Sequence, residues 1–350
     1  MDKTQPTLKD LAKRLNLSVG TVQRALNNKG GYRPETQRRV LEEAEKIGYT
    51  VNPAASALRR PPVCVSAVLP EPVGHNRYFY QYVWQGIEYA CKELAVFQVS
   101  HQKLFVHPHS GEFCDALERL SVSDKVQGVL TVLNRDPRFD EIMDRFARRG
   151  IPVAFINAEK ASGDGRFSVS TGGLAADILA AAHKCLPAQV LLLGGSYENE
   201  LHRRRAMEFS QKLREYCASL SVLEIHEYHD LPKLRGTLAS MLKSLDTLTG
   251  VFSVSTRETL CMCQAVSETG FSGKITTVGV DAFPELLPYF RNGTLTSSIY
   301  HFPVRLAYSV FYQLASQLTS IQSPHVVQSV PAVPVFRSNA DYFCKAEGIL

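Results

Sequence analysis

The chain has 350 residues, of which 45% are hydrophobic and 21% charged, a composition typical of folded globular domains. A chain of this length is too long for a single hydrophobic core and predicts two or three domains. The absence of an apolar run of roughly 18 residues argues against a membrane span. Residues 1–60 hold twelve Lys and Arg against six Asp and Glu, whereas the remaining residues carry 27 basic and 28 acidic side chains. A basic head on a neutral body favours a module that binds a polyanion, with a merely solvated charged face as the alternative.

The head is predicted to contain three short helices. Thr7 can cap the first, whose apolar residues recur at helical spacing: Leu8, Leu11, Ala12 and Leu15. Ser18 can cap the second, over 19–27, which turns three apolar side chains inward: Val22, Ala25 and Leu26. Pro34 begins the third and Gly48 ends it, with an apolar face of Val40, Leu41, Ala44 and Ile47.

Two such helices joined by a tight turn and supported by a third form a helix-turn-helix. The outer face of the second helix separates this motif from an ordinary three-helix bundle, because it carries Val19, Gly20, Gln23 and Arg24 near its start. Such motifs place that end against base edges, where Gln pairs with adenine and Arg with guanine. Ser18 and Thr21 suit phosphate contacts.

Residues 7–60, TLKDLAKRLNLSVGTVQRALNNKGGYRPETQRRVLEEAEKIGYTVNPAASALRR, resemble the DNA-binding head and hinge of the LacI/GalR family of bacterial regulators. The resemblance implies a transcription regulator that binds a palindromic double-stranded DNA operator as a homodimer, with a tetramer as the alternative. It implies DNA contacts from Thr7, Leu8, Ser18, Val19, Gly20, Thr21, Gln23, Arg24 and Asn27, and from Asn52, Ala55 and Leu58 in the hinge. Gln23 stands where the family commonly has Ser, which changes the expected base preference.

In this family the paired hinge leucines wedge into the minor groove and kink the duplex, a role that falls here on Leu58. The alternative for Leu58 is a linker leucine that packs on the core.

From Pro61-Pro62 onward the hydrophobic pattern changes its period. A strand over 63–69 and a helix over 82–94 are followed by apolar runs at 128–133, 153–156, 190–193, 250–254 and 275–280. Strands alternating with helices predict parallel sheets that bind ligands at their carboxyl ends. We therefore expect an all-α head (1–50), a hinge (51–62) and an α/β body (63–350) with two parallel-sheet subdomains, a cleft between them and the dimer contacts.

The body resembles, more weakly, the periplasmic-binding-protein-like effector domain of the same family. Asn76–Tyr80 resembles its NxxFF segment, Arg205–Phe209 its RxxGF with Glu208 for Gly, and Val278–Asp281 its VGFD. His301 replaces the Gln of LTxxxxQxP, and Ser255 and Thr256 replace the Asn and Asp of its AND motif. The resemblance implies a small polar effector, a sugar or sugar-like metabolite, bound by Asn76, Phe79, Tyr80, Asn157, Arg205, Ser255, Thr256, Asp281 and His301.

Several of these residues have a structural alternative. Phe79 and Tyr80 fit core aromatics, and Asp281 fits a loop cap. Arg205 lies in the run Arg203–Arg205 and fits a solvated face, while His301 fits a hydrogen-bonded structural histidine. The replaced residues keep the fold pattern and weaken the sugar pattern.

Enzyme motifs are missing from the sequence. There is no GxGxxG, P-loop, GxSxG or metal-spaced His/Cys cluster, and Gly194-Gly195-Ser196 is too short to count. We expect no catalytic residue, cofactor or metal. Eight scattered cysteines without a CxxC pair predict free thiols in a reducing cytosol, and the N-terminus shows no secretory segment. We therefore expect a cytoplasmic protein, associated with the nucleoid when bound to DNA.

Overall fold

The computed structural model describes residues 6–26, 30–49, 61–107, 111–156, 170–183, 188–196, 199–226, 230–319 and 331–345. The chain divides into two compact units, Met1–Pro61 and Pro62–Leu350, each with its own hydrophobic core.

The first unit is a three-helix head made of α1 (Leu8–Leu15), α2 (Val19–Leu26) and α3 (Pro34–Ile47). Its buried core consists of Leu11, Ala12, Val22, Ala25, Val40 and Ala44. Thr7 and Asp10 form a reciprocal capping box on α1, and Gly48 ends α3 with φ of 68°. Leu41, predicted to face inward, is 49% exposed. It lies ~100° around the helix from Val40, beyond the buried stripe.

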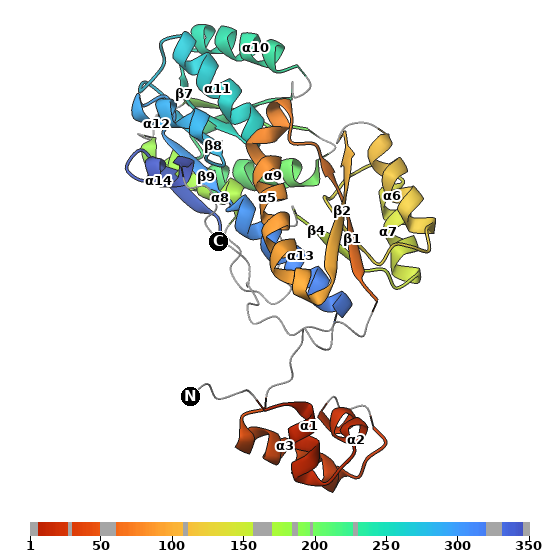
Figure 1. Ribbon diagram of the computed structural model, residues 1–350. Helices are drawn as coiled ribbons and strands as arrows, with labels where there is room; N and C mark the ends of the chain where they lie inside the picture. Colours follow the sequence, from red (N-terminus) through yellow and green to blue (C-terminus); the bar gives the residue numbers. More distant parts are fainter. Residues whose placement is uncertain are drawn as a thin grey trace. The chain divides into compact units, whose positions relative to one another are not determined.

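The second unit contains two sheets. The first has the order β2-β1-β3-β4 and is parallel throughout. Its strands are β1 (Val63–Pro70), β2 (Val99–Val106), β3 (Gly128–Thr131) and β4 (Val153–Phe155). One face packs against α6 (Glu112–Val122) and α7 (Phe139–Arg148), and the other against α5 (Arg77–Leu94) and α13 (Pro303–Thr319) (Figure 1).

The second sheet has the order β10-β9-β8-β7-β5-β6. Its strands are β5 (Ala188–Leu193), β6 (Leu220–Ile225), β7 (Leu248–Ser253), β8 (Thr276–Val280), β9 (Ser297–Tyr300) and β10 (Val333–Phe336). On one face lie α8 (Thr171–Ala182) and α9 (Glu200–Tyr216), and on the other α10 (Leu231–Ser244) and α11 (Thr256–Glu268). Shorter helices are η1 (Gly74–Asn76), η2 (Ala95–Phe97), η3 (Pro284–Leu286), α12 (Leu287–Arg291) and α14 (Ala340–Lys345).

This architecture confirms the predicted fold class, an all-α head followed by an α/β body with two sheets. Two details differ. The strand β10 runs antiparallel to β9, so the second sheet is mixed at one edge. Helix α5 begins at Arg77, five residues before the predicted start at Tyr82. Arg77–Tyr80, which lie in the segment that resembles NxxFF, therefore form the first turn of α5.

Central strands were easier to predict than edge strands. In β5, Val190 and Leu192 face one helical layer while Leu191 and Leu193 face the other, so the strand is apolar throughout. The unpredicted strands β2, β6 and β10 lie at sheet edges. The central strand β9 was hidden by Ser297 and Ser298, which are buried and donate to carbonyl oxygens of Val335 and Asp281.

Helices α5 and α13 cross closely, side by side on the first sheet (Figure 1). Gly86 makes this crossing possible, because a Cβ atom there would lie 2.2 Å from the carbonyl oxygen of Val304. The crossing joins the start of the body to the segment that returns from the second sheet.

We expect Gly86→Ala to destabilise the body by about 1–3 kcal/mol, because the added methyl meets backbone that cannot move aside cheaply. Thermal unfolding followed by circular dichroism measures this. Gly236→Ala in α10 is the matched control, since a Cβ there meets nothing within 4 Å. The control should be neutral or stabilising by up to about 1 kcal/mol through helix propensity. Equal melting temperatures for the two variants would contradict the tight crossing.

Candidate functional site

The outer face of α2 is presented to solvent by the packing of the head. Val22 and Ala25 are completely buried, which turns Val19, Gly20 and Arg24 outward, with Val19 39% exposed. Gln23 lies on the same side and is half-buried. The helix therefore offers a small apolar side chain, a bare backbone, an amide and a guanidinium along one accessible face.

The start of α2 is capped as predicted. The amide of Thr21 donates to the hydroxyl of Ser18 at 3.1 Å, and the two hydroxyl oxygens lie 2.8 Å apart. At α1, the hydrogen bonds from Thr7 lower the pKa of Asp10 below its ordinary value. Thr7 and Ser18 are exposed and Leu8 is half-buried. The other predicted DNA contacts, Asn27, Asn52, Ala55 and Leu58, lie outside the described residues.

A second candidate site lies where the parallel strands of the second sheet end. Five side chains meet there, and we call them the His301 cluster: Thr171, Arg205, Thr256, Asp281 and His301. His301 Nδ1 lies 2.9 Å from Asp281 Oδ1, while Nε2 lies 2.8 Å from Thr171 Oγ1 and 3.0 Å from Arg205 Nη2. The histidine thus bridges the predicted arginine and the predicted acid.

Asp281 is held in place by backbone as well as side chains. It has φ of 62°, a left-handed conformation that Asp tolerates better than most residues. Its amide donates to Ile299 O at 2.8 Å, and Thr256 donates to Oδ2 at 2.5 Å. Burial raises the pKa of Asp281, but the charge effects of His301 and Arg205 and the hydrogen bonds from His301 and Thr256 outweigh burial, so the pKa lies below its ordinary value. The carboxylate is therefore ionised at neutral pH.

Arg205 points into the protein, unlike its neighbour Arg203. It is 6% exposed, and its Nη1 donates to Val254 O at 2.9 Å. Gly172 lets α8 approach it, because a Cβ at Gly172 would lie 2.3 Å from Arg205 O. The alternative of a solvated arginine face is wrong for Arg205.

The other predicted effector residues lie in different surroundings. Ser255 caps α11 by accepting from the amide of Glu258. Phe79 and Tyr80 pack edge to face at 5.2 Å and lie against the first core, as their structural alternative proposed. Asn76 is the half-buried cap of α5, and Asn157 lies outside the described residues.

Tyr78 has a position that was not predicted from the sequence. It stacks on Phe283 at 4.5 Å and belongs to the buried core of the second sheet, although it lies on α5 of the first. Beside it, Arg77 Nη2 lies 3.3 Å from Glu285 Oε1. The start of α5 thus joins the two subdomains. The NxxFF resemblance drew attention to the following aromatics instead.

Glu258 is a buried carboxyl group beside the cluster. It is 1% exposed, and no described residue donates to its Oε2. Burial raises the pKa of Glu258 to about 7, partly offset by Ser255 and Arg257. This acid changes charge near neutral pH.

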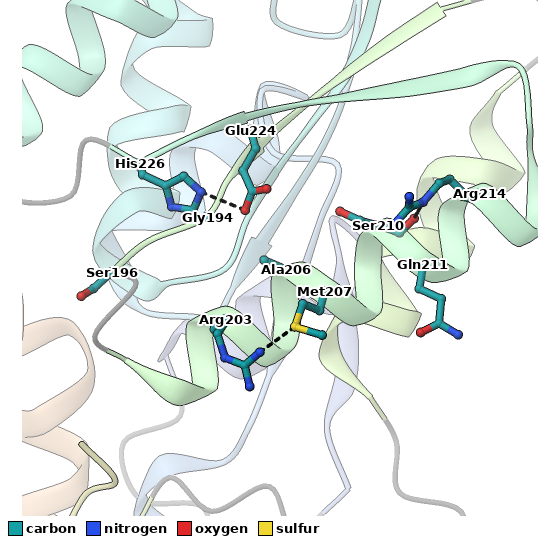
Figure 2. A pocket seen from close by; sticks show the side chains of 10 residues that line it. All are labelled: Gly194, Ser196, Arg203, Ala206, Met207, Ser210, Gln211, Arg214, Glu224 and His226. Atoms are coloured by element: carbon teal, nitrogen blue, oxygen red, sulfur yellow. Dashed lines mark hydrogen bonds and ion pairs between the residues drawn. The ribbon is translucent and has the colours of Figure 1, made fainter. Parts of the chain in front are cut away.

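A pocket of about 390 Å³ lies elsewhere, between α9 and the ends of β5 and β6. Figure 2 shows Arg203, Met207 and Arg214 along α9, opposite Glu224 and His226. Gly194 forms part of its wall, since a Cβ there would lie 2.3 Å from the His226 ring. The pocket contains no member of the His301 cluster, and its lining mixes both charges.

Across the part of the chain that the structure describes, no group of three or more His, Cys, Asp or Glu is placed to hold a metal ion. The same part contains no helix long and apolar enough to cross a membrane. The seven described cysteines are free thiols, four of them buried.

The protein combines a helix-turn-helix head with an α/β body of two sheets. Comparison with known proteins identifies each of these two parts. Residues 7–52 match the family model of bacterial regulatory proteins of the lacI family, and residues 67–321 match that of the periplasmic binding protein domain. The chain therefore belongs, through its body, to the periplasmic binding protein domain family, and it carries a helix-turn-helix domain of the lacI family as its head.

Curated relatives are similar over short stretches. The probable HTH-type transcriptional repressor ExuR of Bacillus subtilis is 46% identical over 52 residues, which is 15% of this chain and 16% of that protein. Catabolite control protein A of Priestia megaterium is 31% identical over 83 residues, 23% of this chain and 24% of that protein. The chain thus matches about a quarter or less of each relative's length.

Solved structures are similar over most of the chain. The glucose-galactose binding protein GanP of Geobacillus stearothermophilus has a TM-score of 0.66 at 20% identity, covering 80% of this chain and 99% of that one. A putative LacI transcriptional regulator of Bacteroides fragilis has a TM-score of 0.67 at 16% identity, covering 81% and 100%. A solute binding protein of Burkholderia graminis in complex with D-arabinose scores 0.68 at 18% identity, covering 81% and 98%. At these identities the likeness establishes the fold.

We expect Glu258→Gln to stabilise the body at pH 8 and to have little effect at pH 4.5. The folded-state pKa of about 7 lies above the ordinary 4.5, so burying the ionised group costs stability that grows as pH rises from 4.5 through 7. The full cost is on the order of 3 kcal/mol, and the neutral amide avoids it. Melting temperatures between pH 4.5 and 8 measure this.

Glu268→Gln at the exposed end of the same helix is the matched control. The Glu268→Gln variant should change the melting temperature only slightly at pH 4.5 and at pH 8. A Glu258→Gln gain that does not change with pH would contradict a buried, titrating carboxyl group.

Proposed function

We propose that this protein is a transcriptional repressor that binds a pseudo-palindromic operator as a dimer and is switched by a small polar effector. The observation that carries the proposal is the accessible α2 face on a LacI-family head, with Gly20 and Arg24 exposed and Gln23 half-buried beside them. The named repressor among the relatives supports the choice of repressor over activator. Such a protein acts where the chromosome lies, in the cytoplasm.

On this proposal α2 enters the major groove with its start toward the bases. Arg24 contacts guanine bidentately, Gln23 contacts adenine, and Thr7, Ser18 and Thr21 bind phosphate. Gly20 and Val19 allow close approach and touch thymine methyl groups, with Leu8 and Asn27 at the margin. These contacts cover only a few base pairs, so useful affinity requires two linked heads, and this favours a dimer.

The hinge completes the proposed interface. Asn52 and Ala55 lie near the minor groove, and Leu58 wedges between base pairs there and kinks the duplex. We expect Leu58→Ala to reduce DNA bending as well as affinity, as measured by gel phasing. Unchanged bending would mean that Leu58 is only a linker residue.

The body is proposed to bind the effector between its two subdomains. Arg205, Thr256, Asp281 and His301 contribute from the second sheet, with Ser255, Asn157, Asn76 and the aromatics Phe79 and Tyr80 around them. Two of the similar solved structures are named for sugars, which supports a carbohydrate or related metabolite. The effector changes DNA affinity only by its differential affinity for the two closures of the body.

A selection from random DNA with the purified full chain tests this function. The enriched sequence should be a pseudo-palindrome. Fluorescence anisotropy should show that scrambling one half-site abolishes cooperative binding and greatly weakens the affinity for the whole site. Analytical ultracentrifugation should find a dimer on the site. A monomeric chain that binds all DNA sequences with equal affinity would contradict the proposal.

We expect Arg24→Ala to weaken binding to the selected operator by about 1–3 kcal/mol and to random DNA far less, because the lost contact is to a base. Anisotropy titrations at one fixed salt concentration measure both affinities. Arg38→Ala is the matched control, because Arg38 is an exposed arginine on α3 paired with Glu42. Arg38→Ala should weaken binding to the selected operator and to random DNA by the same small amount. If Arg24→Ala weakened binding to both DNAs equally, Arg24 would contact only phosphate.

A further inference from the structure

The first two turns of α5 are shared between the two cores of the body. Later buried residues of this helix, among them Val83, Trp84 and Ile87, belong to the core of the first sheet. Tyr78 belongs instead to the core of the second sheet, where it is only 6% exposed, and Tyr82, one turn further on, packs against the same core. Helix α5 is therefore anchored in both subdomains at once.

The stack between Tyr78 and Phe283 is the apolar part of this anchor. The two rings lie nearly parallel, with their centroids 4.5 Å apart and their planes inclined by 22°. Phe283 is fully buried and lies directly before η3 of the second subdomain. An aromatic pair stabilises a contact beyond the area that it buries, so separating the subdomains here would expose apolar surface and lose the stack.

An ion pair accompanies the stack. Arg77 Nη2 lies 3.3 Å from Glu285 Oε1 and donates to Tyr78 Oη at 3.0 Å. The guanidinium carbon of Arg77 also lies 4.6 Å from the centre of the Tyr78 ring. The Arg77 and Glu285 side chains are 46% and 41% exposed, so solvent weakens their attraction. The buried stack therefore supplies most of the stability of this contact, and the ion pair adds a smaller part that salt can screen.

A second ion pair also joins the two subdomains. Arg135 follows β3 of the first sheet, and its Nε lies 3.6 Å from Oε2 of Glu200, the first residue of α9. Arg203 holds the same carboxylate with hydrogen bonds of 2.7 and 3.0 Å. These hydrogen bonds lower the pKa of Glu200 below its ordinary value, so the carboxylate is charged at neutral pH. Side chains of the chain itself thus bridge the subdomains at two places.

We propose that the stack of Tyr78 on Phe283, together with the Arg77–Glu285 ion pair, is a latch that holds the subdomains in one closure. The second closure of the body, on which the regulation of operator binding depends, requires the latch to open. The inference rests on the proposed function, because a body with two closures needs contacts that differ between them. Phe283 follows Asp281, a proposed effector contact, by two residues, so a ligand bound there acts close to the latch.

Hydrogen exchange of the full chain carrying Tyr78→Ala tests the latch without DNA. We expect the segment 284–291, over η3 and α12, to exchange about tenfold faster or more, because it loses its contact with α5. Exchange of β1 and the emission of Trp84, the single tryptophan of the chain, should not change, because both belong to the first core. Tyr216→Ala is the matched control, because Tyr216 is an exposed tyrosine on α9. It should exchange as the parent does over 284–291.

Glu285→Arg weakens the latch without altering either core, because it places two exposed guanidinium groups opposite each other. It should also speed exchange over 284–291, and near 1 M salt this effect should shrink while that of Tyr78→Ala remains. Glu268→Arg is the matched control. Glu268 is also exposed and lies 3.5 Å from Arg235, but this pair joins α10 to α11 within the second subdomain.

Operator affinity, measured by anisotropy with the selected operator, tests the regulatory role. We expect Tyr78→Ala to change it by about fivefold or more, since coupling between sites is typically of this size. Glu285→Arg should change it in the same direction by about two- to fivefold. Tyr216→Ala and Glu268→Arg should bind as the parent does. If Tyr78→Ala does not fold, Glu285→Arg and its control carry the test.

Three results would overturn the inference: unchanged exchange over 284–291 in both latch variants, unchanged operator affinity in both, or affinity changes in opposite directions. The parent chain separates this inference from the proposed function. A parent that binds its operator while the latch variants bind equally well contradicts only the inference. A parent that binds no specific DNA contradicts the proposed function, and the exchange experiment then decides whether the latch exists.

Discussion

The hydrogen bonds of His301 hold together the end of the second sheet on which the rest of the site depends. Through one imidazole, the residue after β9 contacts the acid after β8, the first residue of α8 and an arginine in the middle of α9. These segments are far apart in sequence and are fixed by a buried, charged network. Such a network is costly if it is incomplete, so its members constrain one another and the site is preorganised.

The same residue stands at a crossing between the two subdomains. Only Phe302 separates His301 from Pro303, where α13 begins and returns to the first sheet, and Phe302 has φ of 52°, a strained conformation for a non-glycine residue. Helix α13 then packs tightly on α5 at Gly86, and α5 places Tyr78 in the second core. The His301 cluster is therefore linked through a few closely packed residues to α13 and α5, the helices that join the subdomains.

Head and body have kept different parts of the family pattern. In the head, capping, core and the outward α2 face all agree with one geometry. In the body the fold is retained while Ser255 caps a helix, Thr256 binds Asp281 and Glu208 accepts from Ser170 at 2.5 Å. The same architecture thus carries different side chains at these motif positions, as is expected because a fold constrains its core more than the side chains placed on it.

Hydrophobic period and capping residues act locally, and they were enough to predict the helices of the head, their caps, the fold class and every central strand except β9. The sequence also indicated Arg205 and Asp281 through family motifs. Only the tertiary structure decided that Arg205 is buried, that His301 joins it to Asp281, that Tyr78 rather than Phe79 enters the second core, and that Leu41 is exposed. These depend on contacts between residues far apart in the chain, and no local pattern records which distant side chain will be the partner.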